Sequence, residues 1–243
     1  MDSLILALQF LTVLPLKIRK FSEKKMASSM IFFPVSGLFL GLFLSGIGRL
    51  LLMLNFSPLA LSIILVVALV ILTGGMHLDG LSDTADAFFS GRPREEMLEI
   101  MRDSHIGVMG VLSLVSVMLL KIGFLFSVSA ALKTTALLLM CVLSRWSAVL
   151  AMFLFEYARM EGKAKVFIRG INLKVFLSSL AMVILLAFAI WRLKGLLVLA
   201  IVAGCAYLLG SFSRRKIGGI TGDTLGATIE LTETVVLFIM CIG

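Results

Sequence analysis

Three aspartates occur close together in the sequence, and their spacing suits a shared task. Asp79, Asp83 and Asp86 stand at positions i, i+4 and i+7, so a helix with about 100° of rotation per residue would carry all three carboxylates on one face. Like charges at this spacing repel each other by a few tenths of a kcal/mol per pair, which a bound cation would relieve. Hard oxygen ligands favour Mg²⁺, which typically joins one or two carboxylates to substrate phosphates. We therefore predict that these three aspartates bind Mg²⁺; for Asp79 alone, a helix N-cap is the alternative.

A second acidic pattern lies near the C-terminus. Asp223 and Glu230 are seven residues apart and share one face of a predicted helix, with the small residues Gly226 and Ala227 between them. Small residues allow a neighbouring helix or a ligand to approach closely. The pair could complete the site formed by the first three aspartates, although Asp223 by itself could be a helix N-cap. We therefore predict that Asp223 and Glu230 contribute to the site.

Arginines near these acids would suit an anionic substrate. Arg102 could grip phosphate oxygens with its guanidinium, or pair with Asp103 or Glu99 instead. Arg145 stands near the centre of an apolar segment, where an uncompensated cation costs about 2.5–3.5 kcal/mol. We expect Arg145 to face a phosphate or an acidic partner; a structural salt bridge is the alternative. Arg92, in a loop beside a proline, is a weaker candidate that could equally set the membrane topology.

The sequence has two histidines, His77 and His105, and both border the first acidic stretch. Histidine is the usual proton acceptor near neutral pH, so His77 is a candidate general base. A hydrogen-bonding or interfacial residue at a helix end is the alternative for it. Carboxylates suited to Mg²⁺ and a deep arginine together indicate phosphoryl or nucleotidyl transfer, because this chemistry depends on charge neutralisation and positioning.

The elements that must position these residues are helices in a lipid bilayer. The 243 residues are 60% hydrophobic with a mean hydropathy of +1.12, whereas a soluble chain has an apolar share of about 45–50%. A spanning helix takes about 20 apolar residues. We predict an all-α, polytopic integral membrane helical bundle with about seven transmembrane helices. The segments expected to span are Met30–Leu54, Leu59–Met76, Ile106–Ser129, Thr134–Phe155, Val175–Trp191, Leu196–Phe212 and Thr232–Gly243.

The other features of the chain indicate a single membrane-embedded catalytic domain over residues 1–243. The apolar run Leu4–Leu16 is too short to span comfortably and lacks the pattern of a signal peptide, so we expect a short interfacial or re-entrant helix there. Three cysteines without a CxxC spacing predict neither a disulfide framework nor a zinc site. Homo-oligomerisation is compatible with this sequence.

Lys and Arg gather on one side of the predicted segments. The loops 17–29, 77–105, 156–174 and 214–230 hold five, three, five and three basic residues, sixteen in all. Basic loops usually face the cytoplasm, so we expect a multi-pass protein of the cell (inner) membrane whose active site faces the cytoplasm. This topology accounts for the net charge of +8 without a nucleic-acid partner.

The motifs of the chain resemble those of the adenosylcobinamide-GDP ribazoletransferase family, also called cobalamin synthase. The likeness covers nearly the whole chain, and the HLDGL and MRDS segments at this separation are highly specific. Ala87 stands where family members often have glycine, and His105 where arginine is common, which weakens any catalytic role for His105. The motifs are Phe10-Leu11-Thr12 with Leu14-Pro15, Pro34-Val35 with Gly37 and Gly41, His77-Leu78-Asp79-Gly80-Leu81 with Asp83 and Asp86, Met101-Arg102-Asp103-Ser104, Ser144-Arg145-Trp146, and Thr221-Gly222-Asp223 with Gly226 and Ala227.

The resemblance implies the last step of coenzyme B12 assembly. The 5′-hydroxyl of α-ribazole, or the corresponding phosphate, would displace GMP from adenosylcobinamide-GDP, with Mg²⁺ required. The three aspartates would hold the metal against the diphosphate, the arginines would stabilise charge on the transferred and departing groups, and the second acidic pair would close the site or orient the nucleophile. The residue patterns and the resemblance together predict His77, Arg102, Asp103 and Arg145 as catalytic residues, and Arg92, Ser104, Thr221, Asp223 and Glu230 as substrate-binding residues.

Two other functions are compatible with acidic residues on membrane helices. A CDP-alcohol phosphotransferase that makes phospholipid also uses spaced aspartates, but its signature places an alanine-arginine pair after the first Asp-Gly, where this chain has Leu81-Ser82. A divalent-cation transporter would line a pathway with acids near the bilayer midplane and commonly has paired repeats. The acids of this chain lie at segment ends on one side of the predicted membrane segments. This arrangement favours the ribazoletransferase over the transporter.

Overall fold

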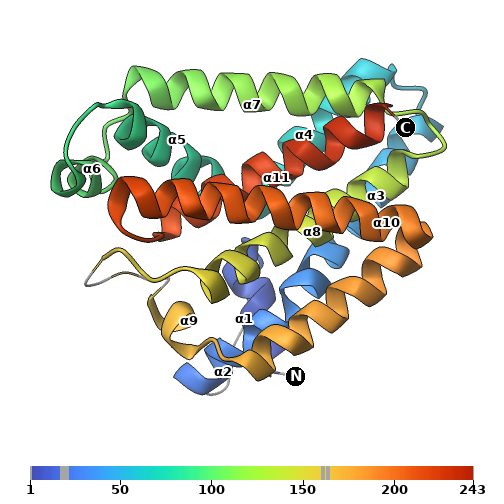
Figure 1. The fold of residues 1–243 in the computed structure, drawn as a ribbon. Coiled ribbons are helices and arrows are strands. Elements are labelled where there is room, and N and C mark those ends of the chain that lie inside the picture. Colours follow the sequence, from blue (N-terminus) through green and yellow to red (C-terminus); the bar gives the residue numbers. More distant parts are fainter. Residues whose placement is uncertain (1, 17–21, 160–161, 163–164, 243) are drawn as a thin grey trace.

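The computed structural model describes residues 2–16, 22–159, 162 and 165–242. Within these ranges the chain forms α-helices and one short 3₁₀ helix, and no β-strand (Figure 1). The predicted all-α fold class is confirmed. The elements are α1 (Asp2–Leu11), α2 (Glu23–Ser29), η1 (Met30–Phe32), α3 (Phe33–Met53), α4 (Pro58–Thr73), α5 (Met76–Phe89), α6 (Arg94–Ile100), α7 (Val108–Ser127), α8 (Lys133–Leu154), α9 (Lys165–Gly170), α10 (Leu173–Ile217) and α11 (Gly222–Ile242).

Five helical segments in the described part of the chain are long and apolar enough to cross a membrane, and a sixth results if α4 and α5 form one bent span. The difference from the predicted seven lies mainly in α10. The predicted segments Val175–Trp191 and Leu196–Phe212 both fall on this helix, which runs for 45 residues but has a non-helical backbone at Trp191 and Arg192. Arg192 has a φ of 49°, and the chain reverses there, so Figure 1 shows α10 as two arms.

The last spanning helix begins earlier than predicted. The prediction started it at Thr232, whereas α11 begins at Gly222 and covers 21 residues. A helix of about 20 residues matches the apolar thickness of a bilayer. Asp223 and Glu230, predicted to precede the span, therefore lie on the spanning helix itself.

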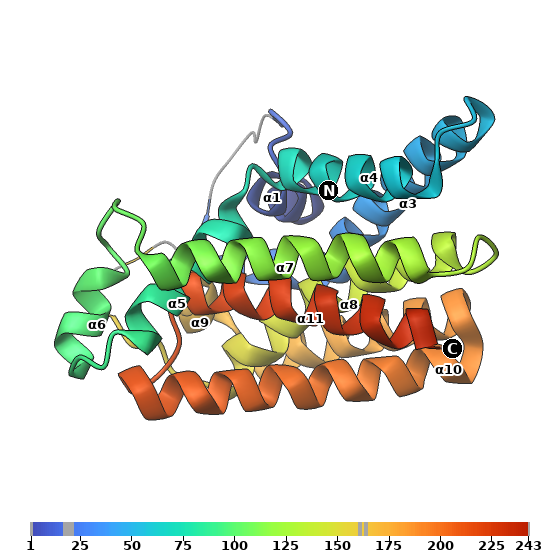
Figure 2. The ribbon, with the colours of Figure 1, turned by 90° about the horizontal axis from the view of Figure 1, so that it is seen from above.

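Helix α8 forms the centre of the bundle. Almost every side chain from Ala136 to Met152 is buried, and α3, α10 and α11 pack around it. Glycines let α3 approach closely: a Cβ on Gly37 would collide with the backbone carbonyl of Cys141. Figure 2 shows α7, α11 and the second arm of α10 running side by side along the remaining part of the bundle.

Two consecutive glycines separate α4 from α5. Gly74 and Gly75 both adopt positive φ angles, 63° and 68°, which a glycine adopts without steric cost. The two helices consequently meet at 90°. This bend turns α5 back against α7 and α11, so the first acidic stretch packs against the second.

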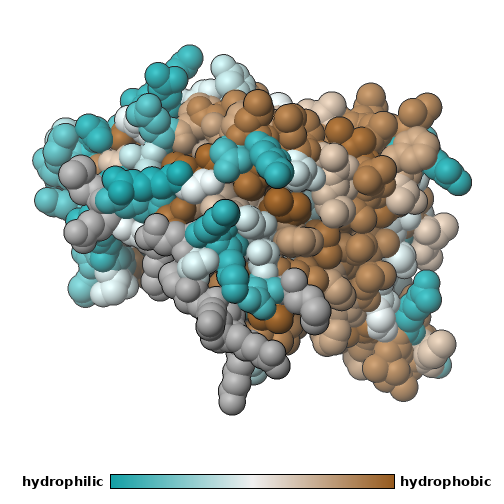
Figure 3. All heavy atoms as spheres, turned by 90° about the horizontal axis from the view of Figure 1, so that it is seen from below, coloured by the Kyte–Doolittle hydropathy of each residue, from teal (hydrophilic) through white to brown (hydrophobic). Residues whose placement is uncertain are grey.

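The polar segments gather at one end of the bundle. Helices α5 and α6, the start of α7, the end of α10 and the start of α11 lie together there (Figure 1). Figure 3 shows hydrophilic residues concentrated at this end, next to a broad hydrophobic surface over the spanning helices. The short helix α1, which is too short to span a bilayer, packs against α2 and α3.

Candidate functional site

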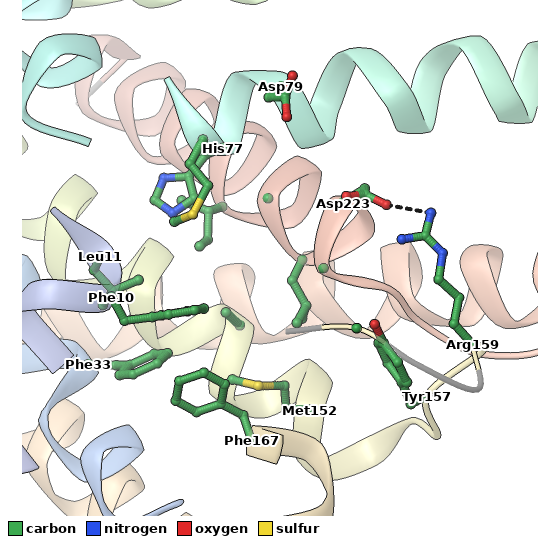
Figure 4. A pocket seen from close by; sticks show the side chains of 17 residues that line it. Phe10, Leu11, Phe33, His77, Asp79, Met152, Tyr157, Arg159, Phe167 and Asp223 are labelled. Atoms are coloured by element: carbon green, nitrogen blue, oxygen red, sulfur yellow. Dashed lines mark ion pairs between the residues drawn. The ribbon is translucent and has the colours of Figure 1, made fainter. Parts of the chain in front are cut away.

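A cavity of about 290 Å³ opens near the polar end, between α1, α3, α5, α8, α9 and α11. Its lining has two chemically distinct halves (Figure 4). Phenylalanines from α1, α3 and α9 form an apolar half, and Asp79, Asp223 and Arg159 form a polar half. The cavity therefore suits a ligand with an apolar group at one end and polar groups at the other.

Glycines bring the two acidic stretches together where α5 crosses α11. A Cβ on Gly80 would lie 2.7 Å from the carbonyl oxygen of Asp223, and a Cβ on Gly226 would lie 3.1 Å from that of His77. The backbones thus touch with almost no side-chain volume between them. The expectation that Gly226 allows the close approach of another helix is confirmed, and the helix is α5.

Three carboxylates surround this crossing. Asp79 is exposed, whereas Asp83 and Asp223 are partly buried. Asp83 lies within electrostatic range of Asp79, Asp223 and Asp86, and all three repel its negative charge. Sequence spacing predicted the grouping on α5, and the fold adds Asp223 from α11. This concentration of negative charge favours a cation at the polar half of the cavity.

Asp86 has a different environment from the other two aspartates of α5. Its carboxylate oxygens accept hydrogen bonds from the backbone amides of Gly107 at 2.7 Å and Gly110 at 2.8 Å. Gly107 is the N-cap of α7 and Gly110 lies in its first turn, where helices leave their N–H groups unsatisfied. Asp86 therefore caps a neighbouring helix, an arrangement that does not favour direct metal binding by this residue.

The donor set fits Mg²⁺ held jointly by protein and substrate. Within the described ranges, no three His, Cys, Asp or Glu side chains converge closely enough to form a metal cage. Mg²⁺ rarely needs such a cage, because it usually keeps several waters and takes one or two carboxylates together with substrate phosphates. Asp79 and Asp83, one helical turn apart, offer two carboxylates of the required chemistry.

Arg159 is a site residue that sequence reasoning missed. It follows α8, and its Nη2 lies 2.8 Å from Asp223 Oδ2 (Figure 4). Arg159 therefore offsets part of the negative charge of the three carboxylates. Tyr157 lines the same cavity, and partial burial raises the pKa of its hydroxyl. No motif marks Arg159 in the sequence, where it stands among the basic residues of a loop. Its proximity to Asp223 depends on the path of the chain after α8.

Thr221 supports the start of α11. Its hydroxyl donates to Asp223 Oδ2 at 3.3 Å, and its backbone amide donates to Thr224 Oγ1 at 2.8 Å. The side chain is fully buried. Thr221 thus orients Asp223, while the cavity lining does not include Thr221 itself.

Arg145 and Glu230 lie in a buried charge network outside the cavity lining. Lys121 of α7 pairs with Glu230 at 2.6 Å and with Glu233, and Arg145 of α8 pairs with Glu233. All four side chains are buried. Two cations and two anions balance each other, as a low-dielectric interior requires. The acidic partner expected for Arg145 is Glu233. Its contacts in the structure are thus those of a structural salt bridge, the alternative given for this residue.

His77 connects this network to the cavity. Its side chain is 3% exposed and lines the cavity next to Asp79. It also lies within electrostatic range of Arg145, Glu233 and Lys121. Figure 4 shows the imidazole between Phe10 and the carboxylates. The role of proton acceptor stays a prediction for this residue.

The MRDS segment forms an exposed turn after α6. Arg102, Asp103 and Ser104 are exposed, and the imidazole of His105 lies 2.6 Å from Asp103 Oδ1. This hydrogen bond lowers the pKa of Asp103 and raises that of His105. Arg102 comes within electrostatic range of Tyr157, which lines the cavity, but Arg102, Asp103 and Ser104 do not line it themselves.

Arg92 does not join the cavity. It is exposed and lies 3.5 Å from Glu96 one turn further along the chain. Together with Glu99 and Asp103 it borders a separate, shallow surface hollow beside α6. The structure therefore brings Asp79, Asp83, Asp223 and His77 together, leaves Arg102 exposed within electrostatic range of Tyr157, and places Arg92 elsewhere.

The fold and cavity define a polytopic membrane protein with carboxylates at the polar end of an amphipathic cavity. Residues 3–241 match the model of the family described as cobalamin-5-phosphate synthase. The adenosylcobinamide-GDP ribazoletransferase of Desulforamulus reducens is 40% identical over 244 residues, which cover 100% of this chain and 97% of the relative. The protein of that name from Roseiflexus sp. is 41% identical over 232 residues, covering 95% of this chain and 86% of the relative. No solved structure matches the chain.

The chain belongs to the cobalamin-5-phosphate synthase family. The family resemblance predicted from the sequence motifs is thereby confirmed.

Proposed function

We propose that this chain transfers the cobinamide-phosphate group of adenosylcobinamide-GDP to α-ribazole or its 5′-phosphate and releases GMP. The family match and the names of both relatives support this activity. The observation that carries it in the structure is the meeting of α5 and α11: Asp79 and Asp223 line the polar end of one cavity, and Asp83 lies within electrostatic range of both. Transfer of a group between phosphates needs such a concentration of charge more than it needs a covalent protein intermediate.

The bond changes in the reaction are simple. A ribose hydroxyl oxygen of α-ribazole forms a bond to the phosphorus that carries cobinamide, the bond from this phosphorus to the GMP oxygen breaks, and the hydroxyl proton leaves. The family description names a 5-phosphate product. A product that keeps its 5′-phosphate has not used the 5′ oxygen, so another ribose hydroxyl must be the nucleophile. This replaces the 5′-hydroxyl implied at first by the resemblance.

Mg²⁺ is the cofactor that suits these residues. Asp79 and Asp83 would hold it, with Asp223 beside them, while Asp86 keeps α7 in place through Gly107 and Gly110. When bound, Mg²⁺ neutralises negative charge on the diphosphate and on the departing GMP.

The remaining side chains bind and orient the reactants. Arg159, already beside Asp223, offers a cation to a phosphate group, and exposed Arg102 offers another at the margin. His77 lies between the apolar and polar halves of the cavity, where it accepts the proton of the attacking hydroxyl. Arg145 and Glu230 act at a distance, because their network fixes α7, α8 and α11 against one another.

The polar end of the bundle faces the cytoplasm in this proposal, since the loops 77–105 and 214–230 at that end belong to the predicted loops that hold sixteen of the 22 Lys and Arg residues. A cysteine introduced at Glu95, which is exposed on α6, tests the orientation. A membrane-impermeant maleimide should label Glu95→Cys in inside-out vesicles and leave it unlabelled in intact cells. Labelling in intact cells would place the site on the other side.

A direct assay tests the activity. The purified protein in lipid nanodiscs receives adenosylcobinamide-GDP, α-ribazole and Mg²⁺, and chromatography measures GMP and the joined corrinoid product. We expect both products in equal amounts, and Asp79→Asn should reduce their formation by about 100-fold or more. Glu95→Gln makes the same carboxylate-to-amide change outside the cavity and should leave the rate unchanged. GMP release without a joined product, or no release at all, would contradict the proposal.

A further inference from the structure

The apolar half of the cavity is built from three aromatic rings. Phe10 lies 4.4 Å from Phe167 and 6.0 Å from Phe33, and Phe33 lies 5.9 Å from Phe167, measured between ring centroids. Phe33 and Phe167 are each 1% exposed. The rings come from α1, α9 and α3, which are distant in the sequence. At such distances the three rings pack directly against one another and form one apolar aromatic wall of the cavity, against which another flat, apolar ring can pack.

The size of the cavity limits what it can hold. Its volume of about 290 Å³ lies at the lower end of the range for small-molecule sites, roughly 300–1,000 Å³. A corrinoid, with its macrocycle and amide side chains, is far too large for it. A single small molecule with one bicyclic aromatic ring and a sugar is of suitable size.

The polar half continues from the aromatic half without a break. Asp79, Asp223 and Arg159 line the same cavity as the three phenylalanines (Figure 4). Leu11 and Met152 complete the apolar half, and none of these five apolar side chains offers an N–H or O–H donor. The ligand must therefore place an apolar ring at one end and hydroxyl or charged groups at the other.

We propose that this cavity is the binding site of the nucleoside acceptor, with its benzimidazole base against the wall formed by Phe10, Phe33 and Phe167 and its ribose hydroxyls beside Asp79 and Asp223. This inference rests on the proposed function and specifies which of the two substrates the cavity takes. The ribose then lies at the carboxylates, where the diphosphate of the donor must also arrive. The corrinoid remains outside the cavity, on the open side of Asp79.

The site should select the base of the acceptor. An adenine base buried against the phenylalanines would leave its amino group without a hydrogen-bond partner, which disfavours binding. A benzimidazole has no such exocyclic donor. We expect the purified protein to prefer α-ribazole over the α-riboside of adenine by tenfold or more in kcat/KM. Equal use of both acceptors would contradict the assignment.

Two variants and a matched control test the aromatic site. Phe10→Leu and Phe167→Leu each remove a ring but keep an apolar side chain. Phe176→Leu makes the same change at a ring that stacks on Phe153 and does not line the cavity. We expect the KM for α-ribazole to rise about tenfold or more in the first two variants, with the KM for adenosylcobinamide-GDP unchanged. An unchanged KM for α-ribazole in both would overturn the proposal.

A binding measurement separates this proposal from the proposed function. Equilibrium dialysis of radiolabelled α-ribazole against the protein in nanodiscs, without the donor, reports the site alone. Weaker binding in Phe10→Leu, which alters a partly exposed ring, supports the site even if no product forms. Product formation with binding unaffected by either ring would overturn the site and leave the function standing. Loss of bound lipid in these variants without loss of α-ribazole binding would identify a lipid tail as the occupant of the cavity. That result would also overturn the assignment of the cavity to α-ribazole.

Discussion

Replacing Gly80 by alanine should disturb the site through the contact between α5 and α11. The added Cβ would lie 2.7 Å from the carbonyl oxygen and 2.9 Å from the Cα of Asp223, both backbone atoms that cannot rotate away. Ordinary contacts begin at 3.4 Å, so the two helices must separate by about 0.7 Å. Overpacking of this kind typically costs about 1–3 kcal/mol in stability.

The effect on turnover should exceed the effect on stability. A shift approaching 1 Å in positioned catalytic groups can cost about 100-fold in rate, and the separation moves Asp79 and Asp83 away from Asp223. We expect Gly80→Ala to lower the rate of GMP release by about 10-fold to 100-fold. The assay compares this rate with the thermal unfolding temperature of the same sample in detergent.

A second glycine provides the matched control. Gly123 lies within α7, and a Cβ there would meet no atom within 4 Å. Gly123→Ala should leave the rate unchanged and stabilise the helix by about 0.5–1 kcal/mol, because alanine loses less backbone entropy than glycine. If Gly80→Ala turned over at the wild-type rate, the crossing would not position the site as we describe.

Three further predictions concern the residues around the site. Lys121→Met leaves two buried glutamates facing one arginine and should destabilise the protein by about 3–5 kcal/mol. In the double variant Lys121→Met with Glu230→Gln, the thermal unfolding temperature should recover. No recovery would refute the charge balance. Asp86→Ala removes the acceptor for two amides of α7 and should cost about 1–2 kcal/mol, with the Mg²⁺ dependence of the rate retained; a changed dependence would point to metal binding. Asp103→Asn should return the pKa of His105 toward 6.5 in an NMR titration. In the wild type, His105 is protonated and paired with Asp103 below its raised pKa, and the ion pair is lost as the pH rises through that pKa. An unchanged pKa of His105 in the variant would show that the pair does not form.

Local patterns were sufficient for much of the site. The spacing of Asp79 and Asp83 predicted a shared helix face, and the small residue Gly226 predicted a close helix contact, because both depend on neighbours within a few turns. The positive φ angles of Gly74 and Gly75 lie close to the end of the predicted segment Leu59–Met76.

Long-range contacts account for what the sequence did not reveal. The function of Asp86 depends on Gly107 and Gly110, which follow it by more than twenty residues. Arg159 reaches Asp223 only because of the path of the chain after α8. No pattern predicts either contact, since helical and loop spacing say nothing about which distant elements meet.

For the buried charge of Arg145, the sequence predicted the need for a partner but not which partner it has. The cost of an unpaired cation in an apolar segment correctly indicated that Arg145 needs a partner. The choice between a phosphate and a carboxylate stayed open, because it depends on how α8, α7 and α11 rotate about their axes. In the structure Glu233 faces both Arg145 and Lys121.

The dependence of GMP release on Mg²⁺ tests the central claim that carboxylates of α5 act on the diphosphate through a cation. Rates are measured over a range of Mg²⁺ concentrations for the wild type, Asp79→Asn, Asp83→Asn and the exposed control Glu95→Gln, with thermal unfolding as a check on folding. We predict that both aspartate variants require at least about tenfold more Mg²⁺ or lose turnover by about 100-fold, while the control matches the wild type. Wild-type rates and an unchanged Mg²⁺ requirement in Asp79→Asn and Asp83→Asn would contradict the account.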